Sequence, residues 1–136
     1  MIFSLATTNT DSLREIYQEV VDHAKTHRGG EALLTAVVAN CDPGDPLAAL
    51  IDASCLWTAR DNSHVPALAI VRERIIQVLY VTPALRRRGV GSSLVRSLLT
   101  SDDPPVDAYA LPGDRATKSL YESMGWKARL LTMRAE

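Results

Sequence analysis

The chain has 136 residues, of which 46% are hydrophobic and 23% charged, a composition that excludes a disordered or fibrous protein and predicts a single domain over residues 1–136. Its formal net charge is -1 at pH 7, so no overall basic field attracts nucleic acid or an anionic membrane, and we expect neither as a partner. No apolar run approaches the roughly 20 residues that span a bilayer, and the N-terminus lacks the basic start of a signal peptide, so we expect a cytoplasmic protein.

Cysteine and histidine are scarce and form no metal-binding motif. The two cysteines are Cys41 and Cys55, and the three histidines are His23, His27 and His64. The cysteines are too few for a disulfide framework, and their spacing from the histidines does not match a zinc site. We therefore predict no metal, and core or loop positions for both thiols.

The first half of the chain predicts a strand, three helices and a three-stranded meander. The apolar start at residues 2–6 is followed by a helix over residues 11–25, in which Ser12 and Glu15 match a capping box. Glycine and proline then divide the chain into two short helices, at about residues 32–38 and 46–52. Three strand-like runs rich in β-branched and aromatic residues follow, at 54–60, 64–71 and 74–81.

The second half changes to helical periodicity. An apolar stripe predicts a helix over residues 91–100, and a short strand follows at 106–111. Asp114 is placed to cap another helix that stops at Gly125, and residues 126–133 predict a final strand. This order indicates an α+β fold, in which the helical crossover makes the fourth and fifth strands parallel neighbours.

The stretch LRRRGVGSS, residues 85–93, lies where a strand gives way to a helix. Gly89 and Gly91 free the backbone so that several N–H groups can converge on one point, and the helix dipole adds partial positive charge there. Three arginines could pair with phosphate oxygens at the same place: Arg86, Arg87 and Arg88. No lysine follows Gly91 as in a Walker A loop, and Leu94 stands where the Rossmann fingerprint needs its third glycine. Alone, the motif fits either a charged surface turn or a phosphate cradle.

A second motif lies downstream, in the helix that begins at Asp114. Its characteristic residues are Leu120, Tyr121, Gly125 and Trp126. Taken with Arg86-Arg87-Arg88-Gly89-Val90-Gly91, this helix resembles the GNAT superfamily of acyl-CoA N-acyltransferases, and in particular its small bacterial members. The motifs carry the resemblance over about residues 70–136, and the first half is similar in element order.

The resemblance implies a GNAT fold, whose mixed, mostly antiparallel sheet contains a splayed pair of parallel strands, and acetyl-CoA as the co-substrate without a metal. It also implies direct transfer of an acetyl group to a primary amine of a small molecule or a protein. Tyr121 would protonate the leaving thiolate, because a phenol remains protonated at neutral pH. The resemblance assigns cofactor binding to Leu79, Tyr80 and Val81 at the strand end, to Arg86, Arg87, Arg88, Gly89, Val90, Gly91 and Ser92 around the pyrophosphate, and to Asp114 and Tyr121.

Departures from the family pattern leave open which residue acts as the general base. Gln77 stands where many relatives have a strand glutamate, and an amide cannot accept a proton. Glu73, four residues earlier on the same predicted strand, is the candidate base, although it also fits a turn or edge charge. His23 and His27, near the end of the first helix, could face the acceptor. Asp114 replaces the usual asparagine and, as a carboxylate, would only accept hydrogen bonds.

The alternative interpretation is a GNAT-fold protein that binds acyl-CoA without catalysing transfer, as a sensor or interaction module. An acetyltransferase that acts on charged tRNA would need a basic surface, which the net charge of -1 does not promise. By analogy with the family, an exposed apolar strand edge near the C-terminus would favour a homodimer.

Overall fold

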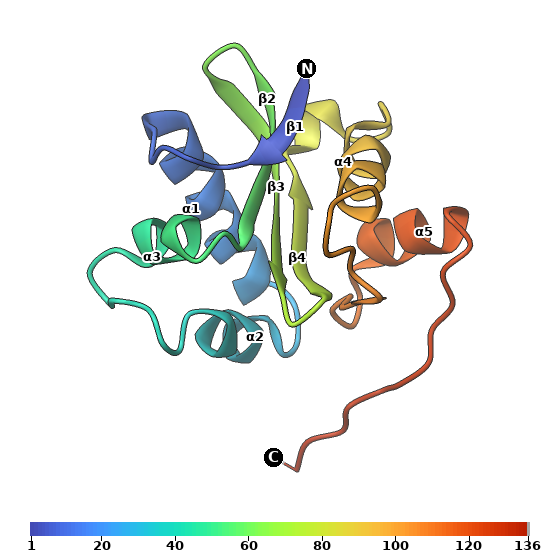
Figure 1. The fold of residues 1–136 in the computed structure, drawn as a ribbon. Helices are drawn as coiled ribbons and strands as arrows, with labels where there is room; N and C mark the ends of the chain where they lie inside the picture. Colours follow the sequence, from blue (N-terminus) through green and yellow to red (C-terminus); the bar gives the residue numbers. More distant parts are fainter. Residues whose placement is uncertain (136) are drawn as a thin grey trace.

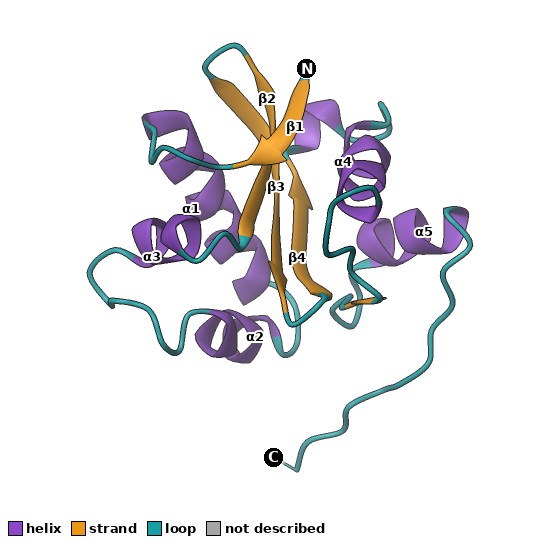
Figure 2. Ribbon diagram, viewed as in Figure 1, coloured by secondary structure: helices purple, strands orange, loops and turns teal. Residues whose placement is uncertain are grey.

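The computed structural model describes residues 1–135, which form an α+β fold around one five-stranded sheet (Figures 1 and 2). The strands lie across the sheet in chain order: β1 (Ile2–Leu5), β2 (Leu56–Asp61), β3 (His64–Arg72), β4 (Ile75–Val81) and β5 (Asp107–Ala108). The α-helices of this part are α1 (Asp11–Lys25), α2 (Gly30–Val37), α3 (Pro46–Asp52), α4 (Val90–Leu99) and α5 (Arg115–Ser123). Within these residues, no helix is both long enough and apolar enough to cross a membrane.

The sheet is antiparallel except at one edge. Strands β1 to β4 pair antiparallel with their neighbours, as the predicted meander requires, whereas β4 and β5 are parallel because α4 crosses between them. Their pairing joins Ile75 to Asp107 and Ile76 to Ala108, and Tyr109 N then donates to Ile76 O at 2.9 Å. Beyond Ile76, no strand of residues 1–135 continues along this edge of β4.

Helices cover both faces of the sheet: α1 and α3 pack on one, the α1 face, and α4 and α5 on the other, the α4 face (Figure 1). Because successive strand side chains point to opposite faces, β3 contributes Leu68 and Ile70 to the α1 face and Ala67 and Ala69 to the α4 face. The small alanine side chains let α4 lie close to the sheet, where it buries Leu94 in the same cluster. Alternate side chains of one strand thus contribute to two separate core clusters, one on each face of the sheet.

The capping box predicted at Ser12 and Glu15 is wrong. Instead, Thr10 caps α1, and its hydroxyl accepts a hydrogen bond from Leu13 N at 3.2 Å. The Ser12 hydroxyl accepts from Val65 N at 2.8 Å, and so ties the first turn of α1 to the start of β3. The local pattern assigned the Ser12 side chain to the helix cap, but in the structure this side chain makes a tertiary contact.

The strand predicted at residues 126–133 is also wrong. Residues 127–135 lie exposed, with neither helix nor strand, and run away from the body of the molecule (Figure 2). Leu130 and Leu131 are 88% and 71% exposed, and two adjacent leucines break the alternation of a half-buried strand. The neighbouring β5 covers Asp107–Ala108 instead of the predicted residues 106–111, so it offers too short an edge for a further strand to pair with.

Candidate functional site

A groove of about 560 Å³ lies between the end of β4, the loop into α4 and the first turns of α5. Its walls include all the predicted cofactor residues except Arg88 and Tyr121. Those that line it are Leu79, Tyr80, Val81, Arg86, Arg87, Gly89, Val90, Gly91, Ser92 and Asp114. The fold therefore brings the two sequence motifs to one groove.

The N-terminus of α4 forms part of this groove. The helix follows Gly89, whose φ of +79° lies in the region that favours glycine. No side chain of residues 1–135 caps this end, whereas threonine or aspartate side chains cap α1, α3 and α5. The first N–H groups of a helix have no intrahelical partner, so here they are free to bind an anion.

Gly91 serves packing rather than backbone conformation. A Cβ at this position would lie 2.6 Å from Leu120 Cδ1 and 3.3 Å from Val81 Cγ2. By contrast, a Cβ on Gly89 would meet nothing within 4 Å. The first glycine of the motif therefore sets the turn into α4, and the second allows α4 and α5 to approach each other.

The three arginines of the loop are exposed and form no ion pair with any of residues 1–135. Arg86 folds back on β4: its Nε donates to Val81 O at 3.0 Å, and its guanidinium carbon lies 5.4 Å from the centre of the Tyr80 ring. Arg87 has a φ of +64° and lines the groove, whereas Arg88 does not line it. The positive charge of Arg87 and Arg88 is thus free for an anionic ligand.

A smaller cavity of about 40 Å³ lies where β4 and the chain after β5 separate, and Gln77 and Tyr109 are among its lining residues. The cavity and the groove meet, because both are lined by His23, Leu79, Tyr80, Asp114 and Thr117.

Tyr121 lies behind the groove in the core of the α4 face. It is 6% exposed, and its ring stacks on Trp126 with centroids 5.4 Å apart. The hydroxyl is buried and has no hydrogen-bond partner among the described residues. Burial, and after it the charge of Asp114, raises the pKa of the Tyr121 phenol well above its usual value, which keeps the proton on the phenol.

Glu73 lies on no strand. It occupies the turn between β3 and β4, where both it and Arg74 have positive φ values of +55° and +61°, the backbone conformation that suits a two-residue hairpin turn. Its side chain is exposed and lines neither the groove nor the smaller cavity. The expectation that Glu73 shares a strand face with Gln77 is therefore wrong, the alternative that it is a turn charge is confirmed, and we propose no catalytic role for it.

Glu19 on α1 holds one wall of the groove in place. Its Oε1 accepts hydrogen bonds from the Tyr80 hydroxyl at 3.1 Å and from the Thr82 hydroxyl at 3.0 Å. Burial and the charge of Glu19 raise the pKa of Tyr80. A glutamate on a helix that also carries Asp11, Arg14 and Asp22 gives no local sign of this contact.

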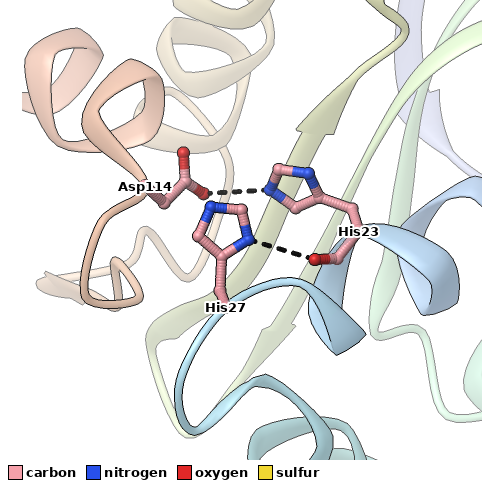
Figure 3. Close-up of side chains that lie close together, drawn as sticks. All are labelled: His23, His27 and Asp114. Carbon is pink, nitrogen blue, oxygen red and sulfur yellow. Dashed lines mark hydrogen bonds and ion pairs between the residues drawn. The ribbon is translucent and has the colours of Figure 1, made fainter.

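A cluster that the sequence did not predict lies where the groove and the cavity meet. His23 from the last turn of α1 and His27 from the turn that follows α1 face Asp114 at the start of α5 (Figure 3). The side chain of His23 is 27% exposed and that of Asp114 11%, and His23 Nε2 lies 3.4 Å from Asp114 Oδ2. Burial alone would raise the pKa of the Asp114 carboxyl, but hydrogen bonds from Thr117 and His23 hold it below its usual value. The sequence signal was the spacing of four residues between the histidines, and the fold supplied the third group.

Comparison with known proteins gives no further guide to the site. No protein-family model, curated protein or solved structure matches this chain.

Proposed function

We propose that this chain binds acetyl-CoA in the groove and transfers the acetyl group to a primary amine of a small molecule or a protein, as its resemblance to the GNAT acyltransferases implies. One observation carries the proposal: residues of both family motifs, from the Gly89–Gly91 loop and from Asp114 onward, line one groove. The mixed sheet with a single parallel pair fits the same proposal.

The uncapped N-terminus of α4 would bind the pyrophosphate. Its free N–H groups and dipole favour an anion, and Arg87, which lines the groove, adds positive charge beside it. Guanidinium groups suit phosphate oxygens because they donate two parallel hydrogen bonds.

The open edge of β4 would bind the pantetheine arm by its backbone. Pairing with β5 stops after Ile76, and the smaller cavity occupies the place where the two chain segments separate. At the other end of this edge, the Arg86 side chain already donates to Val81 O, so a ligand along the strand would compete with Arg86 for that carbonyl.

Acetyl-CoA would supply the acetyl group as a thioester. The amine nitrogen forms the new C–N bond and gives up a proton, the C–S bond breaks, and the sulfur takes up a proton; the proton that leaves the nitrogen restores the proton donor through solvent. Tyr121 is our candidate donor because the resemblance assigns it this role and its hydroxyl has no hydrogen-bond partner within residues 1–135; its raised pKa keeps it protonated but makes it a weaker acid, so donation requires a bound group to lower that pKa. A buried hydroxyl without a partner costs about 1–3 kcal/mol, so a ligand group that reached it would be favoured.

A second candidate, binding of acyl-CoA without catalysis, is favoured by the lack of a carboxylate at Gln77 and by the position of Glu73 in an exposed turn. Thiol release from acetyl-CoA in the presence of an amine library separates the two. Catalysis predicts release above the hydrolysis background, reduced in Tyr121→Phe. Binding of acetyl-CoA with no amine-dependent release would support the second candidate.

The binding proposal itself is tested by calorimetric titration with coenzyme A. We expect Arg87→Ala to raise the Kd about tenfold to hundredfold, because a hydrogen bond to a charged group contributes about 1.5–3 kcal/mol. Arg96→Ala is the matched control, since Arg96 is an exposed arginine in the last turn of the same helix.

Pantetheine, which lacks the pyrophosphate, should bind far more weakly than coenzyme A and should be insensitive to Arg87→Ala. Absence of binding at millimolar coenzyme A, or equal binding of the two ligands, would show that the groove does not hold the pyrophosphate.

A further inference from the structure

We propose that His23, His27 and Asp114 form a binding site for a divalent transition-metal ion such as Zn²⁺. Each side chain offers one ligand atom, and these atoms all lie within 4.8 Å of one another (Figure 3). Two imidazole nitrogens and one carboxylate oxygen are common zinc ligands. This proposal does not depend on the binding of acetyl-CoA.

The spacing of the best-placed pair already suits a metal. His23 Nε2 and Asp114 Oδ2 are 3.4 Å apart, long for a hydrogen bond. Two ligands at about 2.0–2.1 Å from a tetrahedral ion lie about 3.3 Å from each other, so this pair could hold an ion between them with little movement. Small rotations of partly exposed side chains would bring in the third ligand.

The hydrogen bonds of His27 leave the correct nitrogen free. His27 Nδ1 lies 3.0 Å from both His23 O and Thr26 Oγ1. The carbonyl can only accept, and the Thr26 hydroxyl already donates its proton to the same carbonyl at 2.7 Å, so we infer that Nδ1 carries the proton. The lone pair of neutral His27 is then on Nε2. Metal-binding histidines typically donate their other ring N–H to a carbonyl or carboxylate in this way, which fixes both the tautomer and the ring orientation.

Asp114 is held in a similar manner. The Thr117 hydroxyl donates to Asp114 Oδ2 at 2.9 Å, and Thr117 N donates to Oδ1 at 3.3 Å. These contacts fix the carboxylate at the start of α5 while lone pairs remain for an ion. The ligands thus come from two regions of the chain, since His23 and Asp114 are 91 residues apart in the sequence, and hydrogen bonds support the ligand groups of His27 and Asp114.

The ligand types indicate which ions fit. Imidazole suits Zn²⁺, Ni²⁺, Cu²⁺ and Co²⁺, whereas Mg²⁺ and Ca²⁺ prefer sites made of oxygen atoms. Three protein ligands leave one position of a tetrahedral ion open. Because His23 and Asp114 line both the groove and the smaller cavity, water or a molecule bound there would supply the fourth ligand.

The test is titration of the EDTA-treated full chain with Co²⁺, followed by visible absorption, and then displacement by Zn²⁺. We expect one equivalent of Co²⁺, the absorption of a four-coordinate nitrogen and oxygen site, and no thiolate charge-transfer band. His27→Gln and Asp114→Asn should each weaken binding about tenfold or more, and asparagine keeps a capping oxygen at the start of α5. His64→Gln, at an exposed histidine on β3, is the matched control and should bind as the wild type does.

Far-ultraviolet circular dichroism confirms that each variant is folded, and His23→Gln gives a second ligand variant if one is not. The proposal is overturned if the wild type takes up no more Co²⁺ than His27→Gln does. It is also overturned if the spectrum shows cysteine ligation, which would assign the ion to Cys41 or Cys55, or if Mg²⁺ competes on equal terms with Zn²⁺.

Discussion

Tyr80 and Tyr121 are buried to a similar degree on opposite faces of the sheet, with exposed fractions of 8% and 6%, but their hydroxyls differ. On the α1 face, the Tyr80 hydroxyl donates to Glu19, which also accepts from Thr82. On the α4 face, the Tyr121 hydroxyl finds no partner within residues 1–135. The hydrogen bond of Tyr80 stabilises the wall of the groove, whereas the unpaired hydroxyl of Tyr121 lowers the free energy of unfolding.

This difference gives the two hydroxyls opposite expected effects on the stability of the fold. A buried polar group without a partner opposes folding, so its presence beside a groove marks a position where a bound group could complete the hydrogen bond. Tyr80 and Tyr121 can therefore be compared by mutation, because the two residue types and degrees of burial match and the hydrogen bonding does not.

The largest effect is expected for Glu19→Ala. This change removes the acceptor of both the Tyr80 and the Thr82 hydroxyls, so we expect the free energy of unfolding to fall by about 2–3 kcal/mol. Urea denaturation measures the loss. Glu15→Ala is the control, since Glu15 is an exposed glutamate of the same helix, and an equal loss in both variants would contradict a specific role for Glu19.

A smaller effect is expected for Tyr80→Phe. The hydroxyl is lost but Glu19 keeps its bond from Thr82, so the free energy of unfolding should fall by about 1–2 kcal/mol. In the double variant with Glu19→Ala, the two losses should not add, because both variants remove the same hydrogen bond. Additive losses would mean that the Tyr80 hydroxyl contributes through another partner.

Local sequence signals predicted most of the fold. Asp114 caps α5 as its position indicated, Gly125 follows the end of that helix with a φ of +88°, and α4 begins within one residue of its predicted start. These features depend on neighbours within one or two turns of the chain. The glycine-rich loop lies at the groove because a strand and a helix fix its two ends.

Features that depend on distant partners were missed or misplaced. Glu19 and the His23, His27 and Asp114 cluster acquire their roles only when α1 is packed beside β4 and α5. The strand predicted at residues 126–133 had a plausible composition, but strand formation requires an edge to pair with, and β5 is too short to supply one. Neither property can be read from a local window of residues.

The smallest effect on stability, and the most informative, is expected for Tyr121→Phe. Phenylalanine keeps the stacking on Trp126 and removes the unpaired hydroxyl, so the free energy of unfolding should stay constant or rise by up to about 1 kcal/mol. Tyr109→Phe, at a tyrosine that is 45% exposed, is the control and should change it by less than about 0.5 kcal/mol. A loss above about 1 kcal/mol in Tyr121→Phe would mean that the hydroxyl is bonded in solution, for example to a buried water. If Tyr121→Phe has the expected stability and also loses amine-dependent thiol release, the hydroxyl contributes to the reaction with the bound thioester and not to the stability of the fold.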